Sequence, residues 1–168
     1  GIPVGTYSIE FKSVANWATP AQTSVTNVGG ETASKTGTYV PLGSLHVTLS
    51  PTEAAGAGAQ WRWRPAGGDD TTWSQYFNSG QVDSNVPAGN CELEFKELNP
   101  DYWDTPLPKT VAIVFRQTTN EVGVYLGYSR LRVTIQPAEA VTAGAQWRRV
   151  GQPTWLDSGA TEPEVPVG

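Results

Sequence analysis

Hydrophobic and polar residues alternate along several short stretches of this chain. Residues 45–50 read LHVTLS, and residues 91–96 read CELEFK. Successive side chains of a β-strand point to opposite faces of a sheet, so each stretch has one apolar face and one polar face. The alternation predicts half-buried β-strands.

Further stretches of this kind predict an all-β protein. Strands are expected at Tyr7 to Phe11, Ser24 to Val28, Lys35 to Val40, Leu45 to Ser50, Ala57 to Arg64, Trp73 to Phe77, Asn90 to Lys96, Thr110 to Phe115 and Glu121 to Leu126. The 18 Gly and 13 Pro favour short strands joined by turns. Tight turns are expected at Pro3-Val4-Gly5, Pro87-Ala88-Gly89 and Pro166-Val167-Gly168, because Pro fixes φ and Gly accepts a positive φ.

A long internal repeat organises these strands. Residues 44–62, SLHVTLSPTEAAGAGAQWR, return as residues 129–148, SRLRVTIQPAEAVTAGAQWR. Leu45 and Trp61 return 86 positions later as Leu131 and Trp147. Repeats of this length mark modules in tandem. Antiparallel strands at this spacing predict immunoglobulin-like β-sandwich modules.

The repeat divides the chain into one complete module and two halves. Residues 1–42 are expected to be the second half of a repeat, residues 43–128 a complete β-sandwich, and residues 129–168 the first half of another. The chain opens on IPVG and closes on VPVG, the same point of the repeat. A half-sandwich leaves an apolar face and strand edges open to water. The two halves are therefore expected to complete one another head to tail, through a neighbouring copy or adjoining sequence.

The run Val86-Pro87-Ala88-Gly89, the alternating strand after it, Tyr102-Trp103 and Lys109-Thr110-Val111 together resemble the PEGA-type repeats of bacterial and archaeal surface proteins. The resemblance implies a β-sandwich in a secreted or cell-surface protein without catalytic activity. The insertion at Ala66 to Thr72 departs from the pattern, since the next copy has only Gly151-Gln152-Pro153 there.

Composition and charge exclude several classes of function. The net charge is −5, which disfavours binding to nucleic acid or to anionic membrane surfaces. No apolar run is long enough to span a membrane. The single cysteine, Cys91, cannot form a disulfide within the chain, and its alternating strand places it in a core.

Residues that could carry chemistry are few. His46 is the only histidine and faces outward, and one His with one Cys excludes a zinc site. Glu92 and Glu94 share the outer face of one strand with Lys96. A solvated charged face is a simpler interpretation of this pair than acid–base catalysis. The aspartates at 69, 70, 83, 101 and 104 lack the ordered spacing of a calcium loop. We therefore expect no enzyme activity, no metal and no cofactor.

The tryptophans suggest structural anchors and one alternative. Trp61, Trp147, Trp17 and Trp103 are expected to anchor cores. Trp73 and Trp155 follow loops and could stack on sugar rings if they are exposed. Carbohydrate binding or adhesion as a module of a secreted protein is thus the alternative function.

A second feature points to assembly. The strands at Thr110 to Phe115 and Glu121 to Leu126 are apolar on both faces, with Ala112, Val114, Val122 and Val124 on the outer one. The first copy has Ser24, Thr26, Thr36 and Thr38 where the central copy has Thr110, Ala112, Val122 and Val124. A strand pair that is apolar on both faces is usually covered twice. The leading expectation is an extracellular or cell-surface structural protein that forms a fibre or stalk by packing on copies of itself.

Overall fold

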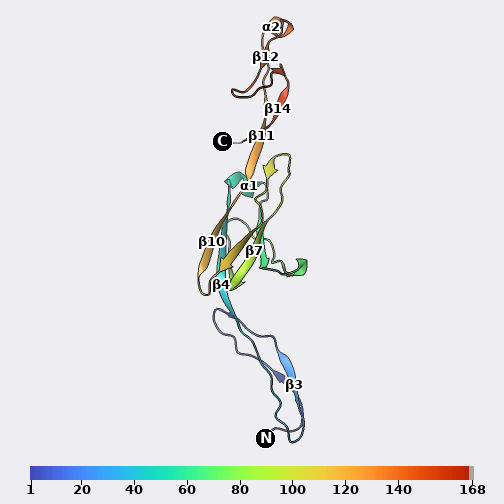
Figure 1. Ribbon diagram of the computed structural model, residues 1–168, viewed down its shortest axis with the longest axis vertical. Coiled ribbons are helices and arrows are strands. Elements are labelled where there is room, and N and C mark those ends of the chain that lie inside the picture. The colour runs from blue at the N-terminus through green and yellow to red at the C-terminus, as the bar shows by residue number, and fades with distance from the viewer. Residues whose placement is uncertain (167–168) are drawn as a thin grey trace.

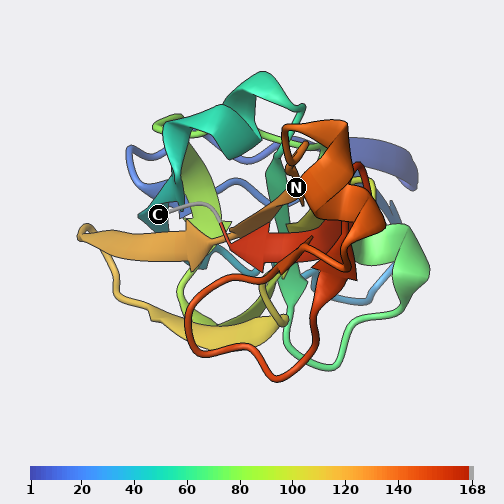
Figure 2. The same ribbon diagram turned by 90° about the horizontal axis from the view of Figure 1, so that it is seen from above.

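The computed structural model describes residues 1–166. The chain is drawn out along one axis, with the N-terminus at one end and helix α2 at the other (Figure 1). Viewed along that axis, the C-terminal part lies over the central part (Figure 2). We call residues 1–42 the N-terminal segment, residues 43–128 the central unit and residues 129–166 the C-terminal segment. The predicted turn Pro166-Val167-Gly168 extends outside the described residues.

The chain is all-β, as predicted, with short helical turns. The strands are β1 (Gly5–Ile9), β2 (Trp17–Ala18), β3 (Thr23–Asn27), β4 (Val40–Ser50), β5 (Trp61–Pro65), β6 (Val82–Pro87), β7 (Gly89–Phe95), β8 (Trp103–Asp104), β9 (Lys109–Ile113), β10 (Thr118–Val124), β11 (Leu126–Arg132), β12 (Gln146–Trp147), β13 (Leu156–Asp157) and β14 (Thr161–Pro166). The helical turns are α1 (Thr52–Gly56), η1 (Asp70–Thr72) and α2 (Ala138–Thr142). No described helix has the length and apolar character needed to cross a bilayer.

The central unit contains two sheets around one core. In the first sheet β4 lies between β10 and β6, and in the second β7 lies between β5 and β9. Alternate residues of both sheets are buried and belong to one hydrophobic cluster: Leu45, Val47, Leu49, Trp61, Cys91, Leu93, Phe95, Val111 and Ile113. The apolar face predicted for each alternating strand is therefore the face that packs.

Each end segment carries a smaller set of strands. In the N-terminal segment β1 pairs with β3, and β2 pairs with the start of β4. In the C-terminal segment β11 pairs with β14, β12 pairs with β13, and the start of β11 pairs with β8 of the central unit. Strands β4 and β11 thus each run from one part of the chain into the next.

Structural details recur at the offset seen in the sequence. The bridge between Trp17 and Pro41 returns as the bridge between Trp103 and Gly127, 86 positions later. The register of β4 with β6 shifts between Gly43 and Leu45, and that of β11 with β14 shifts between Ser129 and Leu131. Helices α1 and α2 begin at positions 52 and 138. The sequence repeat and these local structural features therefore share one offset.

Three predictions about strand direction and extent are wrong. The predicted antiparallel arrangement fails for β4 and β10, which pair in parallel from Ser44 and Thr118 onward. The predicted strand from Lys35 to Val40 is absent, because only Val40 belongs to a strand. The predicted strand from Trp73 to Phe77 is reduced to a single bridge between Trp61 and Phe77.

Other elements were shifted or missed. The strand predicted from Ala57 begins only at Trp61, because Ala57 and Gly58 form the turn that ends α1. That helix ends where Gly58 takes a φ of +97° and the Ala59 amide donates back to the Ala54 carbonyl at 2.9 Å. A left-handed glycine is a common way to end a helix. Strand β6 was not predicted, since VDSNVP does not alternate cleanly.

Cys91 gives a first testable outcome. Its side chain is 1% exposed and unpaired, as the alternation predicted. Burial, and then the nearby Glu121 carboxylate, raises the pKa of the thiol to about 11. Because the thiolate is the reactive form, we expect a thiol reagent at neutral pH to label the native protein at least about a hundredfold more slowly than the unfolded chain. Equal rates in a labelling time course would contradict this placement.

Candidate functional site: the uncovered faces of the end segments

The N-terminal segment exposes a face that its counterpart in the central unit buries. Strand β1 corresponds to β7 and β3 to β9, since the two pairs share one register. Tyr7, Ile9 and Val25 are half-buried. They occupy the positions of Cys91, Leu93 and Val111, which are at most 4% exposed. The hollow beside this face is lined by Ile2, Val4, Tyr7, Ile9 and Val25 among others.

The C-terminal segment exposes the opposite half of the same core. Leu131 is 37% exposed, and Val133 and Ile135 are half-buried. Their counterparts Leu45, Val47 and Leu49 are at most 2% exposed. In the central unit these β4 side chains join Cys91, Leu93 and Val111 in one cluster. Each end segment therefore has the apolar face that the other lacks.

Strand structure is also missing where a partner strand is missing. Residues 32–38 correspond to β10, yet none of them lies in a strand. Strand β12 has two residues, whereas its counterpart β5 has five and pairs along its whole length with β7. A strand edge needs a neighbour to satisfy its backbone groups. Local sequence is thus insufficient to order these segments as strands.

Charged residues on the outer face of the second sheet form cross-strand pairs. Arg62 Nε donates to Glu94 Oε2 at 2.5 Å, and Arg64 Nε donates to Glu92 Oε2 at 2.7 Å. The hydrogen bond from Arg64 is the main cause that lowers the pKa of Glu92. Glu92 and Glu94 thus act as salt-bridge partners, in keeping with the charged face expected from the sequence.

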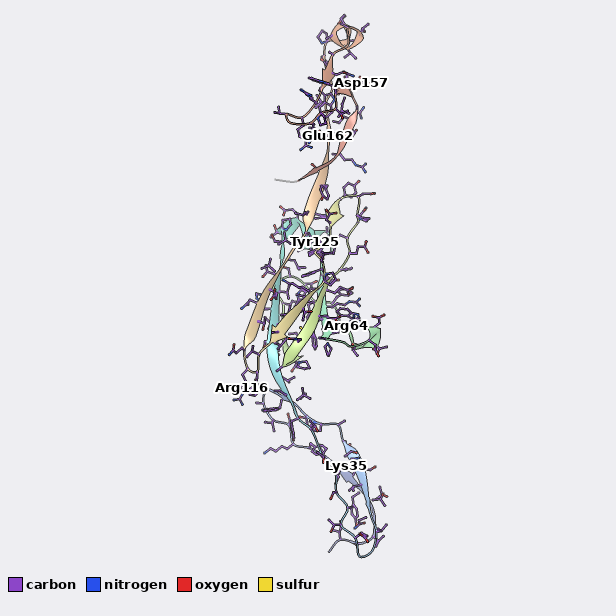
Figure 3. The ribbon with its side chains drawn as sticks, viewed as in Figure 1. Lys35, Arg64, Arg116, Tyr125, Asp157 and Glu162 are labelled. Carbon is purple, nitrogen blue, oxygen red and sulfur yellow. The ribbon has the colours of Figure 1, made fainter. Side chains whose placement is uncertain are left out.

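Aromatic rings cover these arginines. The Arg62 guanidinium lies 4.6 Å from the Trp73 ring and 4.8 Å from the Tyr76 ring, and Arg64 lies 4.4 Å from the Trp73 ring. Figure 3 shows Arg64 on the side of the central unit from which the η1 loop projects. Arginine on an aromatic face is a stabilising contact. This stack was not predicted from the sequence, although the run RWR opposite ELE is its signal.

The two tryptophans proposed for sugar stacking do not form a pair. Trp73 is half-buried and lies in the central unit, whereas Trp155 is 52% exposed and lies in the C-terminal segment. Arg148 lies 4.3 Å from the Trp155 ring, as Arg62 does from Tyr76 at 4.8 Å. Trp147 donates its indole N–H to the Asp157 carbonyl as Trp61 does to the Asn78 carbonyl. Trp155, which precedes Asp157 as Tyr76 precedes Asn78, therefore matches Tyr76 and not Trp73. Both tryptophans are occupied by guanidinium groups on one side.

The four tryptophans expected in cores occupy two kinds of position. Trp61 is 0% and Trp147 9% exposed, and the indole N–H of each donates to a backbone oxygen, of Asn78 and Asp157 respectively. Trp17 and Trp103 are half-buried on β2 and β8, where successive parts of the chain meet. The Trp17 ring lies 5.0 Å from that of Phe115 in the central unit.

The strip proposed for assembly lies on the surface of the central unit. Ala112 is exposed, Val114 is 47% exposed, and Val122 and Val124 are 53% and 55% exposed. The buried residues between them, such as Val111 and Ile113, face the core. The strip thus lies on the outer face of β9 and β10, with Val114 just after the end of β9.

The remaining candidates for chemistry have ordinary structural partners. His46 Nδ1 lies 2.9 Å from Asn120 Oδ1, across the β4 and β10 pair. The Asp69 side chain accepts hydrogen bonds from the Thr71 hydroxyl and amide, which lower its pKa and fix the start of η1. Among residues 1–166, no three His, Cys, Asp or Glu side chains lie where they could share a metal ion.

No family model, curated protein or solved structure matches this chain. The uncovered faces of the end segments are therefore the features of this chain that indicate a function.

Proposed function

We propose that this chain is a non-catalytic structural protein built from tandem immunoglobulin-like β-sandwich units, and that it assembles head to tail into a fibre or surface stalk. The C-terminal segment of one copy supplies the first half of a sandwich. The N-terminal segment of the next copy supplies the second half. The resemblance to PEGA-type repeats supports a location outside the cell or on its surface.

One observation carries this proposal. Six residues of the two end segments that correspond to core residues of the central unit are apolar and partly exposed, three in each of two complementary halves. Leu131, Val133 and Ile135 belong to the first half. Tyr7, Ile9 and Val25 belong to the second. The burial of apolar surface is the main favourable term when proteins associate. Joining the two halves would bury both apolar faces.

The direction of the chain suits a fibre. The two end segments lie at opposite ends of the long axis, as Lys35 and Glu162 show in Figure 3. One chain cannot then close its own halves on each other. A contact between unlike ends repeats without closing, and such contacts build filaments.

Sedimentation of the whole chain tests the proposal. We expect the sedimentation coefficient to rise with concentration as copies join. Val133→Asp places a carboxylate in the completed core, where an unpaired charge costs about 3 kcal/mol or more, so association should weaken by at least about a hundredfold. Leu107→Asp is the matched control, because Leu107 is 85% exposed in the central unit and should leave association unchanged.

A clear result would refute head-to-tail assembly. If the unmodified chain remains monomeric up to millimolar concentration while amide exchange shows residues 5–9 and 131–135 protected, the end segments are stable alone. An equal loss of association in Val133→Asp and Leu107→Asp would also refute head-to-tail assembly. The loss would then come from the added negative charge and not from the position of Val133 in a completed core.

A further inference from the structure

The central unit shows how the first and last strands of one unit meet. Strand β10 pairs in parallel with β4, with Thr118 opposite Ser44 and Val124 opposite Ser50. Parallel pairing of two strands from distant parts of the chain fixes both the direction and the register of the first sheet. Any unit with the same plan needs the same pair.

The two members of that pair lie on different end segments. Residues 130–136 correspond to 44–50, and residues 32–38 correspond to 118–124. Strand β11, which ends at Arg132, pairs with β14 in the same way that β4 pairs with β6. Residues 32–38 lie in no strand. Each segment therefore holds one strand position of a pair and lacks the other.

We propose that copies of this chain join by parallel strand pairing between residues 130–136 of one copy and residues 32–38 of the next, with Arg130 opposite Thr32 and Gln136 opposite Thr38. This rests on the proposed head-to-tail assembly and specifies its contact. The occupant of each open edge is a second copy of the chain, and residues 32–38 become a strand only when the copies join.

Close packing at a glycine supports this register. Gly123 on β10 lies against the Phe95 ring and the Leu49 side chain, so that a Cβ there would overlap both. Gly37 lies against the Phe11 ring in the same way. In the proposed register Ile135 faces Gly37, as Leu49 faces Gly123. The N-terminal segment thus holds Gly37 and Phe11, two of the three residues of this contact, and Ile135 of the other copy supplies the third.

Charge complementarity between β5-like and β7-like residues of the second sheet also supports the proposed joint between copies. In the central unit β5 pairs antiparallel with β7, with Trp61 opposite Phe95 and Arg62 opposite Glu94. The corresponding residues are Trp147 with Phe11 and Arg148 with Glu10. Arg148 and Glu10 are both exposed. The joined copies would pair them as Arg62 pairs with Glu94 at 2.5 Å.

One close approach differs between the central unit and the proposed joint. A Cβ on Gly43 would overlap the Val114 carbonyl oxygen, and Ser129 occupies the equivalent position in the C-terminal segment. The facing turn contains Phe115 and Arg116 in the central unit and Gly29 and Gly30 in the N-terminal segment. Two glycines give that turn the backbone freedom to accept the serine.

Disulfide trapping in the whole chain tests the register. Thr36→Cys with Thr134→Cys places a cysteine at each of two directly opposed positions, and oxidation should give a ladder of linked multimers. Ser34→Cys with Thr134→Cys is the matched control, because it requires a slip of two residues, and should link at least about tenfold more slowly. Thr48→Cys with Val122→Cys calibrates the reaction, since these residues are opposed within one chain and should yield a linked monomer.

The outcomes separate this proposal from assembly itself. If the chains associate in sedimentation but the ladder forms only with the Ser34→Cys pair, or with neither pair, the register is overturned and head-to-tail assembly stands. If the chains neither associate nor link, both proposals fall. Unmodified protein, which retains buried Cys91, provides the background and should give no ladder.

Charge reversal gives an independent test of the second sheet. Arg148→Glu and Glu10→Arg should each weaken association by about fivefold, the size expected for a partly exposed pair, because each variant alone sets two like charges against each other at every joint. Mixing the two variants should restore the affinity of the unmodified chain. Every joint between unlike variants then pairs a carboxylate with a guanidinium, so the two variants should alternate along the filament.

The mixture decides whether this contact exists. If mixing fails to regain affinity while both single variants still associate weakly, the contact between Arg148 and Glu10 is overturned. An equimolar mixture of either variant with the unmodified chain is the control, and it should associate less tightly than the mixture of the two variants.

Discussion

Replacing Trp61 with alanine is expected to lower the free energy of unfolding of the central unit by about 3–5 kcal/mol. The Trp61 side chain is fully buried, stacks on Phe77 with ring centroids 4.6 Å apart, and donates its indole N–H to the Asn78 carbonyl at 3.0 Å. Alanine would leave a cavity between the sheets and remove one of the two hydrogen bonds that the Asn78 carbonyl accepts. Both effects reduce the stability of the folded state.

Denaturant melts followed by circular dichroism measure this loss. Trp155→Ala is the matched control, because Trp155 is 52% exposed and lies in the C-terminal segment. We expect that control to change the free energy of unfolding by less than about 1 kcal/mol. A similar small change for Trp61→Ala would mean that the two sheets do not depend on this side chain.

Much of the fold follows from side-chain alternation. The strand predicted from Asn90 to Lys96 is β7, within one residue at each end, and its buried face is the predicted one. Alternation reports the burial of one face, so it works where a strand packs on a core. It fails for residues 35–40, which alternate without having a partner strand on which to pack.

Other features depend on contacts that no local pattern encodes. The parallel pairing of β4 and β10 joins residues 74 positions apart, such as His46 and Asn120. Helix α1 follows the signal of a proline, an acidic first turn and a closing glycine, which was available in the sequence although no helix was predicted from it. The helix thus has a local signal, whereas the parallel pairing has none.

The candidate site was predictable in outline and not in detail. The repeat phase identifies two half-units, and their exposed apolar residues follow from it. The match of Trp155 with Tyr76 was missed because the loop before Trp155 is shorter than the loop in the central unit. The signal was available, since Trp155 precedes Asp157-Ser158-Gly159 as Tyr76 precedes Asn78-Ser79-Gly80. The equivalent hydrogen bonds of Trp61 to Asn78 and of Trp147 to Asp157 establish the match.

Strongly alkaline solution is expected to destabilise the central unit through two buried acids. Burial raises the pKa of Cys91 from its ordinary 9.0 to about 11 and that of Tyr125 from 10.0 to about 12, with smaller effects from Glu121 and Tyr76 respectively. Both side chains are 1% exposed, and the Tyr125 hydroxyl donates to the Lys96 carbonyl at 2.8 Å. Folding therefore favours the neutral form of each group.

The sign of the pH effect follows from proton binding. Below about pH 9 both groups are protonated in the folded and unfolded chain, so their contribution is fully present. Above that pH the unfolded chain releases the protons first, and stability falls until the folded groups also ionise, near pH 11 for Cys91 and pH 12 for Tyr125. Each group should contribute a loss of about 2 kcal/mol.

Equilibrium melts between about pH 8 and 12 test this with matched variants. Tyr125→Phe removes the buried acid and keeps the ring, so it should be less stable at neutral pH by about 1 kcal/mol for the lost hydrogen bond, yet lose about 2 kcal/mol less on going to about pH 12. Tyr102→Phe removes an exposed hydroxyl and should retain the full loss. Parallel curves for all three proteins would show that Tyr125 ionises alike in the folded and unfolded chain, which is incompatible with its place between the two sheets.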